Sequence, residues 1–281
     1  MVAGNRFRKL FGVFSRTGLG GEGILRTEGR GREAHQMLTG AYEAGIRYYD
    51  SAPAYAGSER YLGRFWQEHP GWAKEAFQTS KSAERDAQGA LADLARSLST
   101  LGRDQLGLWQ IHDLRDAVDI RRLEAKGGAL QAFYSARTTG TVRAIGVTGH
   151  HDPAVLLHAV SSWDVDSVLL PVSPIETALS GFSDLVIPAA RERGIGVIGM
   201  KVFGGGSYLS PESGLLPEHF LRYALSQDVD MVIAGCSNQN EARLLARVGN
   251  EFSPMDEEEQ SRLVGLFRPY ARLLAFYRGV I

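Results

Sequence analysis

Short apolar runs alternate with longer amphipathic segments along nearly the whole 281-residue chain. The runs VRAIGV, VIGM and MVIA are almost continuously apolar and do not alternate between polar and apolar residues. This pattern is typical of parallel strands that are buried on both faces, with a helix covering each crossover. We therefore expect a parallel sheet whose strands are separated by helices.

The number of strand–helix units sets the architecture. Strands are expected at residues 46–50, 76–80, 106–111, 142–147, 167–171, 196–199 and 231–234. Helices are expected at 32–44, 59–68, 87–101, 130–138, 153–161, 184–193, 217–227 and 239–247, with a last amphipathic helix from about 256 to 277. With a glycine-rich first unit at 17–23 there are eight units, which is the number that closes a (β/α)8 barrel. We predict one α/β TIM-barrel domain spanning residues 1–281, with an extra C-terminal helix.

The competing architecture is an open, doubly wound sheet. It would place a G-x-G-x-x-G turn between the first strand and its helix. The glycines in the first unit are close to this spacing but do not match it: Gly18, Gly20, Gly21 and Gly23. The barrel is therefore the better interpretation.

Composition and charge limit the partners. The net charge is -1, with 44% hydrophobic and 22% charged residues, so we expect neither nucleic-acid nor membrane binding. The basic start (Arg6, Arg8 and Lys9) is not followed by the apolar segment of a signal peptide. The single cysteine, Cys236, suits a reducing compartment, and a buried, inert thiol is expected. These features predict a cytoplasmic protein.

Four polar residues mark a candidate site. The stretch 45–63, GIRYYDSAPAYAGSERYLG, puts Asp50 at the end of a strand and Tyr55 on the loop that follows. The next two strand-like runs end in Lys81 and His112. Because the carboxyl ends of barrel strands share one mouth, these four side chains are expected to converge.

Their chemistry suits proton transfer to a carbonyl oxygen. A free tyrosine has a pKa of about 10 and is a weak acid near neutrality. We expect the Lys81 ammonium to lower the pKa of Tyr55, Asp50 to hold the lysine charged, and His112 to donate a hydrogen bond to the substrate oxygen. Each residue alone has an ordinary structural interpretation, but their joint occurrence at successive strand ends favours a catalytic one.

At this point the chain resembles a known family. Residues 45–63 are similar to the aldo/keto reductase signature G-x-R-x-x-D-T-A-x-x-Y-G-x-S-E-x-x-L-G, and DLARSLSTLGRDQLGLWQIH is similar to that family's second signature. The resemblance implies a barrel, a nicotinamide cofactor (NADP(H) by default, NAD(H) as the alternative) and a small carbonyl substrate. It also implies a catalytic set of Tyr55, as general acid/base, with Asp50, Lys81 and His112.

The resemblance also implies cofactor contacts, at positions where the motifs depart from the family pattern. Thr148-Gly149 and Leu169 stand where Ser-Asn and Gln are common, and Met200 stands where an aromatic residue often stacks on the nicotinamide. A glycine run after the seventh strand could approach a pyrophosphate through its backbone amides, or could be a plain flexible loop. The predicted cofactor-binding residues are Thr148, Met200, Lys201, Gly204, Gly205, Ser237, Asn238 and Arg243.

A pair of histidines raises the possibility of a metal site. His150 and His151 precede Asp152, but adjacent residues on an extended segment point to opposite sides. The sequence offers no other cluster with the spacing of metal ligands. We therefore predict no metal, and His150 is an alternative substrate contact.

Two other functions remain open. The barrel could hold a nicotinamide cofactor as a sensor or regulatory subunit with little turnover. It could also be a phosphosugar isomerase or lyase that uses the glycine-rich loops for phosphate. The identity of the substrate and the oligomeric state do not follow from the sequence.

Overall fold

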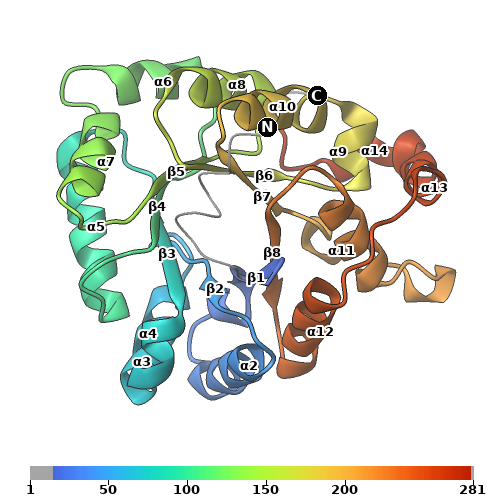
Figure 1. Ribbon diagram of the computed structural model, residues 1–281, viewed down its shortest axis with the longest axis horizontal. Helices are drawn as coiled ribbons and strands as arrows, with labels where there is room; N and C mark the ends of the chain where they lie inside the picture. The colour runs from blue at the N-terminus through green and yellow to red at the C-terminus, as the bar shows by residue number, and fades with distance from the viewer. Residues whose placement is uncertain (1–14, 280–281) are drawn as a thin grey trace.

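The computed structural model describes residues 15–279, in which eight parallel strands close into a barrel in sequence order (Figure 1). The predicted TIM-barrel fold is therefore confirmed. The basic start (Arg6, Arg8 and Lys9) lies outside the described residues. The strands are β1 (Thr17–Gly23), β2 (Tyr48–Tyr49), β3 (Phe77–Ser82), β4 (Leu108–Ile111), β5 (Ile145–Thr148), β6 (Ser167–Pro171), β7 (Gly196–Met200) and β8 (Met231–Cys236).

Helices surround the barrel on the outside (Figure 1). Those that follow the predicted segments are α2 (Gly31–Glu43), α3 (Ser58–Glu68), α5 (Ala87–Leu101), α7 (Ala129–Thr138), α8 (Pro153–Ser162), α10 (Ile187–Glu192), α11 (Pro217–Ser226) and α12 (Gln239–Asn250). Three short helices were not predicted: α4 (Pro70–Glu75), α6 (Ala117–Glu124) and α9 (Pro174–Leu179). Of these, α4 and α9 begin with a proline, the residue best suited to the first helical position.

Local signals explain where the elements agree or differ. Helix α5 has its predicted bounds because the Asp86 side chain accepts a hydrogen bond from the backbone N–H of Gly89, and Gly102 ends the helix with φ 62°. The last helix is shorter than predicted. It ends at Phe267 in α13 (Glu257–Phe267), because Pro269 lies in the turn that follows, and α14 (Ala271–Leu274) comes after that turn.

A layer of apolar side chains fills the barrel interior. It includes aromatic and aliphatic residues from six of the strands, all nearly inaccessible to solvent. The members are Tyr48, Phe77, Leu108, Ala144, Leu169, Ile198, Met231 and Ile233. This packed layer makes the barrel a solid core rather than a pore, as is usual in this architecture.

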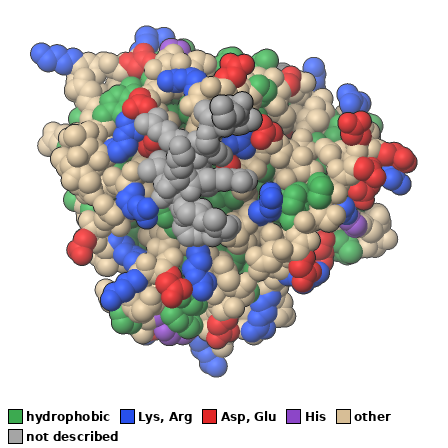
Figure 2. Space-filling view, in the orientation of Figure 1, with side chains coloured by type: hydrophobic (Ala, Val, Ile, Leu, Met, Phe, Trp, Pro, Cys, Tyr) green, Lys and Arg blue, Asp and Glu red, His purple; other side chains and the backbone are tan. Residues whose placement is uncertain are grey.

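The surface has mixed charge. Basic and acidic side chains are interspersed over the face shown in Figure 2. Within residues 15–279, no helix combines the length and apolar character needed to cross a membrane.

Candidate active site

A buried ion pair forms the base of the site. Lys81 Nζ lies 2.5 Å from Asp50 Oδ2 and also donates to the backbone carbonyl of Ser51 at 2.8 Å. The other carboxylate oxygen of Asp50 accepts hydrogen bonds from Thr79 (2.9 Å) and Gln110 (3.3 Å). Lys81 and Asp50 are 1% and 2% exposed. Charges buried to this extent persist only when they are paired and hydrogen-bonded, which this carboxylate and this ammonium are.

Tyr55 and His112 complete the predicted four. The Tyr55 hydroxyl lies 3.3 Å from His112 Nε2, and the two rings meet edge to face. Lys81 Nζ lies over the Tyr55 ring, 4.8 Å from its centre. The structure therefore brings the ends of β2, β3 and β4 together around one phenol.

Burial controls the protonation of these groups. It raises the pKa of Tyr55 well above its usual value, and the nearby Asp50 carboxylate raises it further. Burial also lowers the pKa of Lys81, against the opposing effect of Asp50. The pKa of His112 is lowered to about 3, first by burial and then by the Lys81 charge, so this imidazole is neutral near pH 7. The expected lowering of the Tyr55 pKa is therefore not met, because loss of solvation dominates.

Glycine in β1 leaves room for the tyrosine ring. A Cβ atom at Gly21 would lie 2.6 Å from the Tyr55 ring and 3.0 Å from the backbone oxygen of Asp50. Any larger residue would displace the ring or the strand end. The glycine-rich first strand is therefore a packing requirement of the site.

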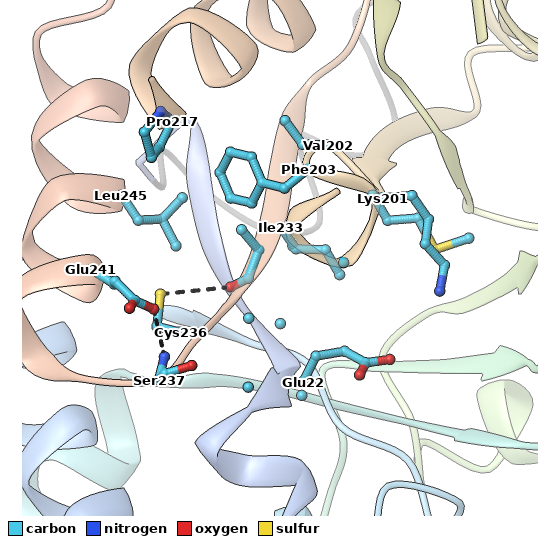
Figure 3. Close-up of a pocket in the computed structure, with 18 of the residues that line it drawn as sticks. Glu22, Lys201, Val202, Phe203, Pro217, Ile233, Cys236, Ser237, Glu241 and Leu245 are labelled. Carbon is cyan, nitrogen blue, oxygen red and sulfur yellow. Dashed lines mark hydrogen bonds between the residues drawn. The ribbon is translucent and has the colours of Figure 1, made fainter. Parts of the chain in front are cut away.

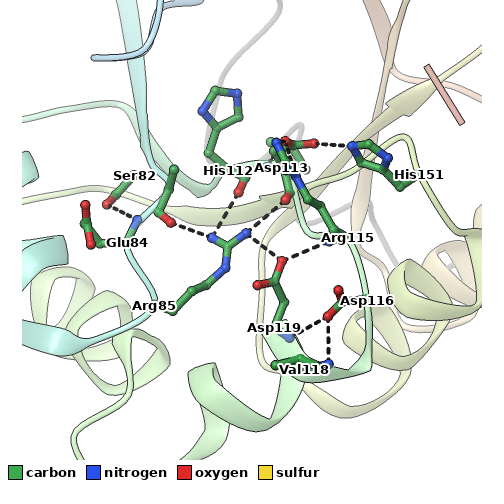
Figure 4. Close-up of polar contacts among 12 residues, drawn as sticks. Ser82, Glu84, Arg85, His112, Asp113, Arg115, Asp116, Val118, Asp119 and His151 are labelled. Atoms are coloured by element: carbon green, nitrogen blue, oxygen red, sulfur yellow. Dashed lines mark hydrogen bonds and ion pairs between the residues drawn. The ribbon is translucent and has the colours of Figure 1, made fainter. Parts of the chain in front are cut away.

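Arg85 is a residue that the sequence analysis missed. Its guanidinium donates to the backbone carbonyls of Ala83 (3.0 Å), His112 (3.1 Å) and Asp113 (2.9 Å), and to Asp119 Oδ2 (2.8 Å) (Figure 4). The side chain is 8% exposed. By binding the backbone just after β3 and just after β4, Arg85 fixes the position of His112. An arginine four residues after Lys81 was the only signal in the sequence.

A cavity of about 590 Å³ is lined by Asp50 and Tyr55 but not by Lys81 or His112, and part of its lining is drawn in Figure 3. It falls within the range of small-molecule and cofactor pockets. Asp50 and Tyr55 line one end, and Ser237 and Glu241, at the start of α12, line another part. The remaining wall comes mainly from β1, β7, β8 and the loops that follow them, including Gly20, Gly21, Gly23, Met200, Val202, Phe203, Ile233 and Cys236, with Leu169 from β6. The cavity thus connects the catalytic groups to a helix N-terminus.

The predicted cofactor residues divide into two groups. Those in the cavity lining are Met200, Lys201, Gly205 and Ser237, and those outside it are Thr148, Gly204, Asn238 and Arg243. Burial raises the pKa of the Cys236 thiol, which also lines the cavity, to about 12.

The four residues outside the lining have other contacts. Thr148 is buried, and its hydroxyl accepts a hydrogen bond from the backbone N–H of Asp113 at 2.9 Å. Gly204 faces the Tyr208 ring, and Asn238 caps α12 through its side-chain oxygen. Arg243 is exposed on α12. A direct cofactor contact by any of these four stays a prediction.

A carboxylate occupies the start of α12, where Ser237 and Asn238 were predicted to bind the cofactor. Glu241 accepts hydrogen bonds from the backbone N–H of Ser237 (2.7 Å) and from the Asn238 side chain (2.8 Å). Both donors lie at the N-terminus of α12, where a negative charge is favoured. The sequence analysis did not single out Glu241, because its role depends on the side chain folding back over the helix start.

Comparison with known proteins agrees with this architecture. The family model "Aldo/keto reductase family" matches residues 18–220. D-threo-aldose 1-dehydrogenase from Pseudomonas sp is 30% identical over 69% of this chain and 66% of its own length. Pyridoxal 4-dehydrogenase from Microbacterium luteolum is 23% identical over 65% of this chain and 64% of its own. The chain thus matches just under two thirds of the length of these curated relatives.

Solved structures of low identity share the fold. An aldo-keto reductase from Klebsiella pneumoniae in complex with NADPH has a TM-score of 0.74 at 15% identity, covering 91% of this chain and 92% of that one. A putative aldo-keto reductase from Pseudomonas aeruginosa has a TM-score of 0.70 at 23% identity, covering 86% and 92%. Together with the family match over most of the chain, these findings show that the protein belongs to the aldo/keto reductase family.

Proposed function

We propose that this protein is a nicotinamide-dependent oxidoreductase that interconverts an aldehyde or ketone and the corresponding alcohol, with Tyr55 as general acid/base. The observation that carries the proposal is the convergence of Tyr55, His112 and the buried Lys81–Asp50 pair, with Tyr55 and Asp50 lining the cavity. A cofactor in this cavity would supply or accept the hydride.

Proton transfer is the part that the protein's own side chains perform. Because the pKa of Tyr55 is raised, the phenol is protonated near pH 7 and can give its proton to the oxygen of a carbonyl undergoing reduction. Lys81 then lies close enough to stabilise the resulting phenolate, and Asp50 holds the ammonium in place. The neutral His112 can hydrogen-bond the same oxygen through Nε2 and orient the carbonyl.

The cavity fits a nicotinamide cofactor in shape and in the character of its lining. The glycines of β1 leave the wall open beside Tyr55, and apolar side chains such as Leu169 and Met200 can cover a ring face. Lys201 provides a cation in the lining, and Gly205 provides accessible backbone. The negative charge of Glu241 would repel the 2′-phosphate of NADP(H) at the start of α12. We therefore favour NAD(H) over the NADP(H) expected from the resemblance.

The substrate panel follows from the names of the relatives. One is a dehydrogenase of an aldose and the other a dehydrogenase of pyridoxal. We propose small, polar carbonyl compounds and their alcohols or hemiacetals as substrates, so aldoses, pyridoxal and simple aldehydes should be tested with both NAD(H) and NADP(H).

The test is the variant Tyr55→Phe, which removes one hydroxyl and keeps the ring. Because general acid catalysis contributes about 10²–10⁴-fold, we expect turnover to fall by at least about 100-fold. Cofactor affinity, measured by fluorescence titration, should change little. Tyr61→Phe is a matched control, because the Tyr61 hydroxyl accepts a hydrogen bond from the Arg30 backbone and does not line the cavity. Retention of most of the rate by Tyr55→Phe would contradict the assignment.

A further inference from the structure

Three potential metal ligands converge beside the catalytic residues. Asp113 directly follows His112 after β4, and His150 and His151 follow β5. His150 Nε2 lies 3.1 Å from Asp113 Oδ1, and His151 Nε2 lies 3.3 Å from the same oxygen. All three ligand atoms lie within 4.8 Å of one another. Figure 4 shows His151 and Asp113 facing each other close to His112.

A bend in the chain makes this convergence possible. Residues 150 and 151 form a bend rather than an extended segment, and the two imidazole rings lie 4.5 Å apart between centres. The expectation that the rings point to opposite sides is therefore not met. Asp152 is not the third member, because its side chain caps α8 through the backbone N–H of Ala154. The third member, Asp113, comes from the preceding strand end.

The Asp113 carboxylate has one satisfied oxygen and one unsatisfied oxygen. Oδ2 accepts two hydrogen bonds from the Arg115 guanidinium, at 2.8 and 2.6 Å. Oδ1 is buried and accepts no hydrogen bond from residues 15–279, although both imidazole nitrogens lie close to it. A buried, unsatisfied carboxylate oxygen is costly, and here it faces the centre of the cluster.

The hydrogen bonding of His150 leaves a lone pair aimed at this oxygen. His150 Nδ1 lies 2.9 Å from the backbone carbonyl of Tyr277, which can only accept, so Nδ1 carries the proton. In the neutral ring, Nε2 is then unprotonated. Two lone-pair atoms at 3.1 Å repel each other unless a proton or a metal ion lies between them. A histidine that donates through one nitrogen to a backbone carbonyl and binds metal through the other is the usual arrangement in metal sites.

We propose that Asp113 Oδ1, His150 Nε2 and His151 Nε2 bind a divalent transition-metal ion such as Zn²⁺. Zinc bonds of about 2.0–2.2 Å to tetrahedral N and O ligands imply separations of about 3.3 Å between ligand atoms. The two separations from Asp113 Oδ1, 3.1 and 3.3 Å, are close to that value. Two histidines and one carboxylate leave further coordination positions open. The ion would be bound by Asp113, the residue that directly follows the catalytic His112.

A second histidine cluster serves as a comparison. His35, Glu68 and His69 also bring their ligand atoms within 4.8 Å of one another, on the outer helices. There, however, the Nε2 atoms of His35 and His69 form a hydrogen bond with each other at 3.4 Å, and Glu68 also accepts from Arg64. That cluster is explained by its own hydrogen bonds and by contact of its rings with Trp72 and Phe65.

The test is a metal titration of the purified chain after treatment with a chelator and its removal. Calorimetry with Zn²⁺ should show one tightly bound ion (one equivalent) per chain. Co²⁺ at the same site should give the visible absorption of a coordinated ion. Asp113→Asn and His151→Ala should each lower the affinity of this equivalent by more than about tenfold, since loss even of outer partners of a metal ligand costs about 10–100-fold. Asparagine suits position 113, which has φ 54°.

Two controls separate this site from other metal binding. His158→Ala removes a histidine of α8 that pairs with Glu124, and His69→Ala breaks the second cluster. Neither variant should change the affinity for the tightly bound Zn²⁺ ion. The proposal is wrong if the native chain takes up no Zn²⁺. It is also wrong if Asp113→Asn and His151→Ala bind as the native chain does, or if His69→Ala removes the equivalent. Because the readout is metal affinity, these outcomes are independent of whether the oxidoreductase activity is confirmed.

Discussion

The two sides of the barrel mouth are built differently. On the β2–β4 side, Asp50 and Lys81 are almost fully buried, and each makes several hydrogen bonds. On the β7–β8 side, the cavity wall adds to the strands the loop after β7 and the start of α12, with the exposed side chain of Glu241. Residues on the first side are held by strands, so their relative positions are fixed by the fold itself. Many residues on the second side are held by the loop after β7 or by the start of α12, and loop conformation varies more easily.

The largest effect that tests this comparison is expected from Lys81→Met. The substitution leaves the Asp50 carboxylate buried without its ammonium partner, which costs about 3–5 kcal/mol of unfolding free energy. It also removes the charge that stabilises a Tyr55 phenolate, so turnover should fall by about 100-fold or more. Urea unfolding and steady-state rates measure the two effects.

A double variant separates stability from catalysis. Asp50→Asn combined with Lys81→Met removes both charges, so the unfolding free energy should return to within about 1 kcal/mol of the native value. Turnover should remain low, because the ammonium is still missing. If the double variant recovered turnover together with stability, the role of Lys81 would be structural only.

A smaller effect is expected from Arg85→Lys. Lysine keeps the charge but cannot reproduce the fork that binds three backbone carbonyls and Asp119. We expect the unfolding free energy to fall by about 1–3 kcal/mol. Because His112 loses its support, kcat should fall by about tenfold while cofactor affinity is unchanged.

The matched variant for Arg85 is Asp119→Asn. It removes the charge of the side-chain partner and leaves the three carbonyl contacts of Arg85 in place. The native kcat should be largely retained. A loss of stability without any change in kcat for Arg85→Lys would show that the β4 strand end is positioned without this side chain.

The difference between the two sides also explains what could be predicted from the sequence. The barrel and the convergence of Asp50, Tyr55, Lys81 and His112 follow from strand ends, because the fold brings the carboxyl ends of successive strands to one mouth. Helix α5 was predicted to the residue, because its capping signals are local. The protonation of Tyr55 was not, because burial depends on side chains distant in sequence.

The remaining differences come from bends and folded-back side chains. The break after Phe267 was foreseeable from Pro269, but an amphipathic pattern that continues beyond the proline hid it. The bend at residues 150 and 151 brings His151 toward Asp113, a partner 38 residues earlier in the chain, which spacing alone does not show. Glu241 reaches back over Ser237, so its position at the cavity also required the structure.

The smallest effect, and the sharpest probe of the loop-built side, is expected from Glu241→Gln. Glutamine can still accept from the Ser237 backbone but carries no charge, so repulsion of an additional phosphate at the start of α12 is removed. A single exposed charge contributes up to about 1 kcal/mol, so the ratio of the Kd for NADP(H) to that for NAD(H) should fall by about two- to fivefold. The pyrophosphate is common to both cofactors, so the ratio isolates the 2′-phosphate. Glu251→Gln, at the opposite end of α12, should leave the ratio unchanged. An unchanged ratio in Glu241→Gln would place the 2′-phosphate away from this helix.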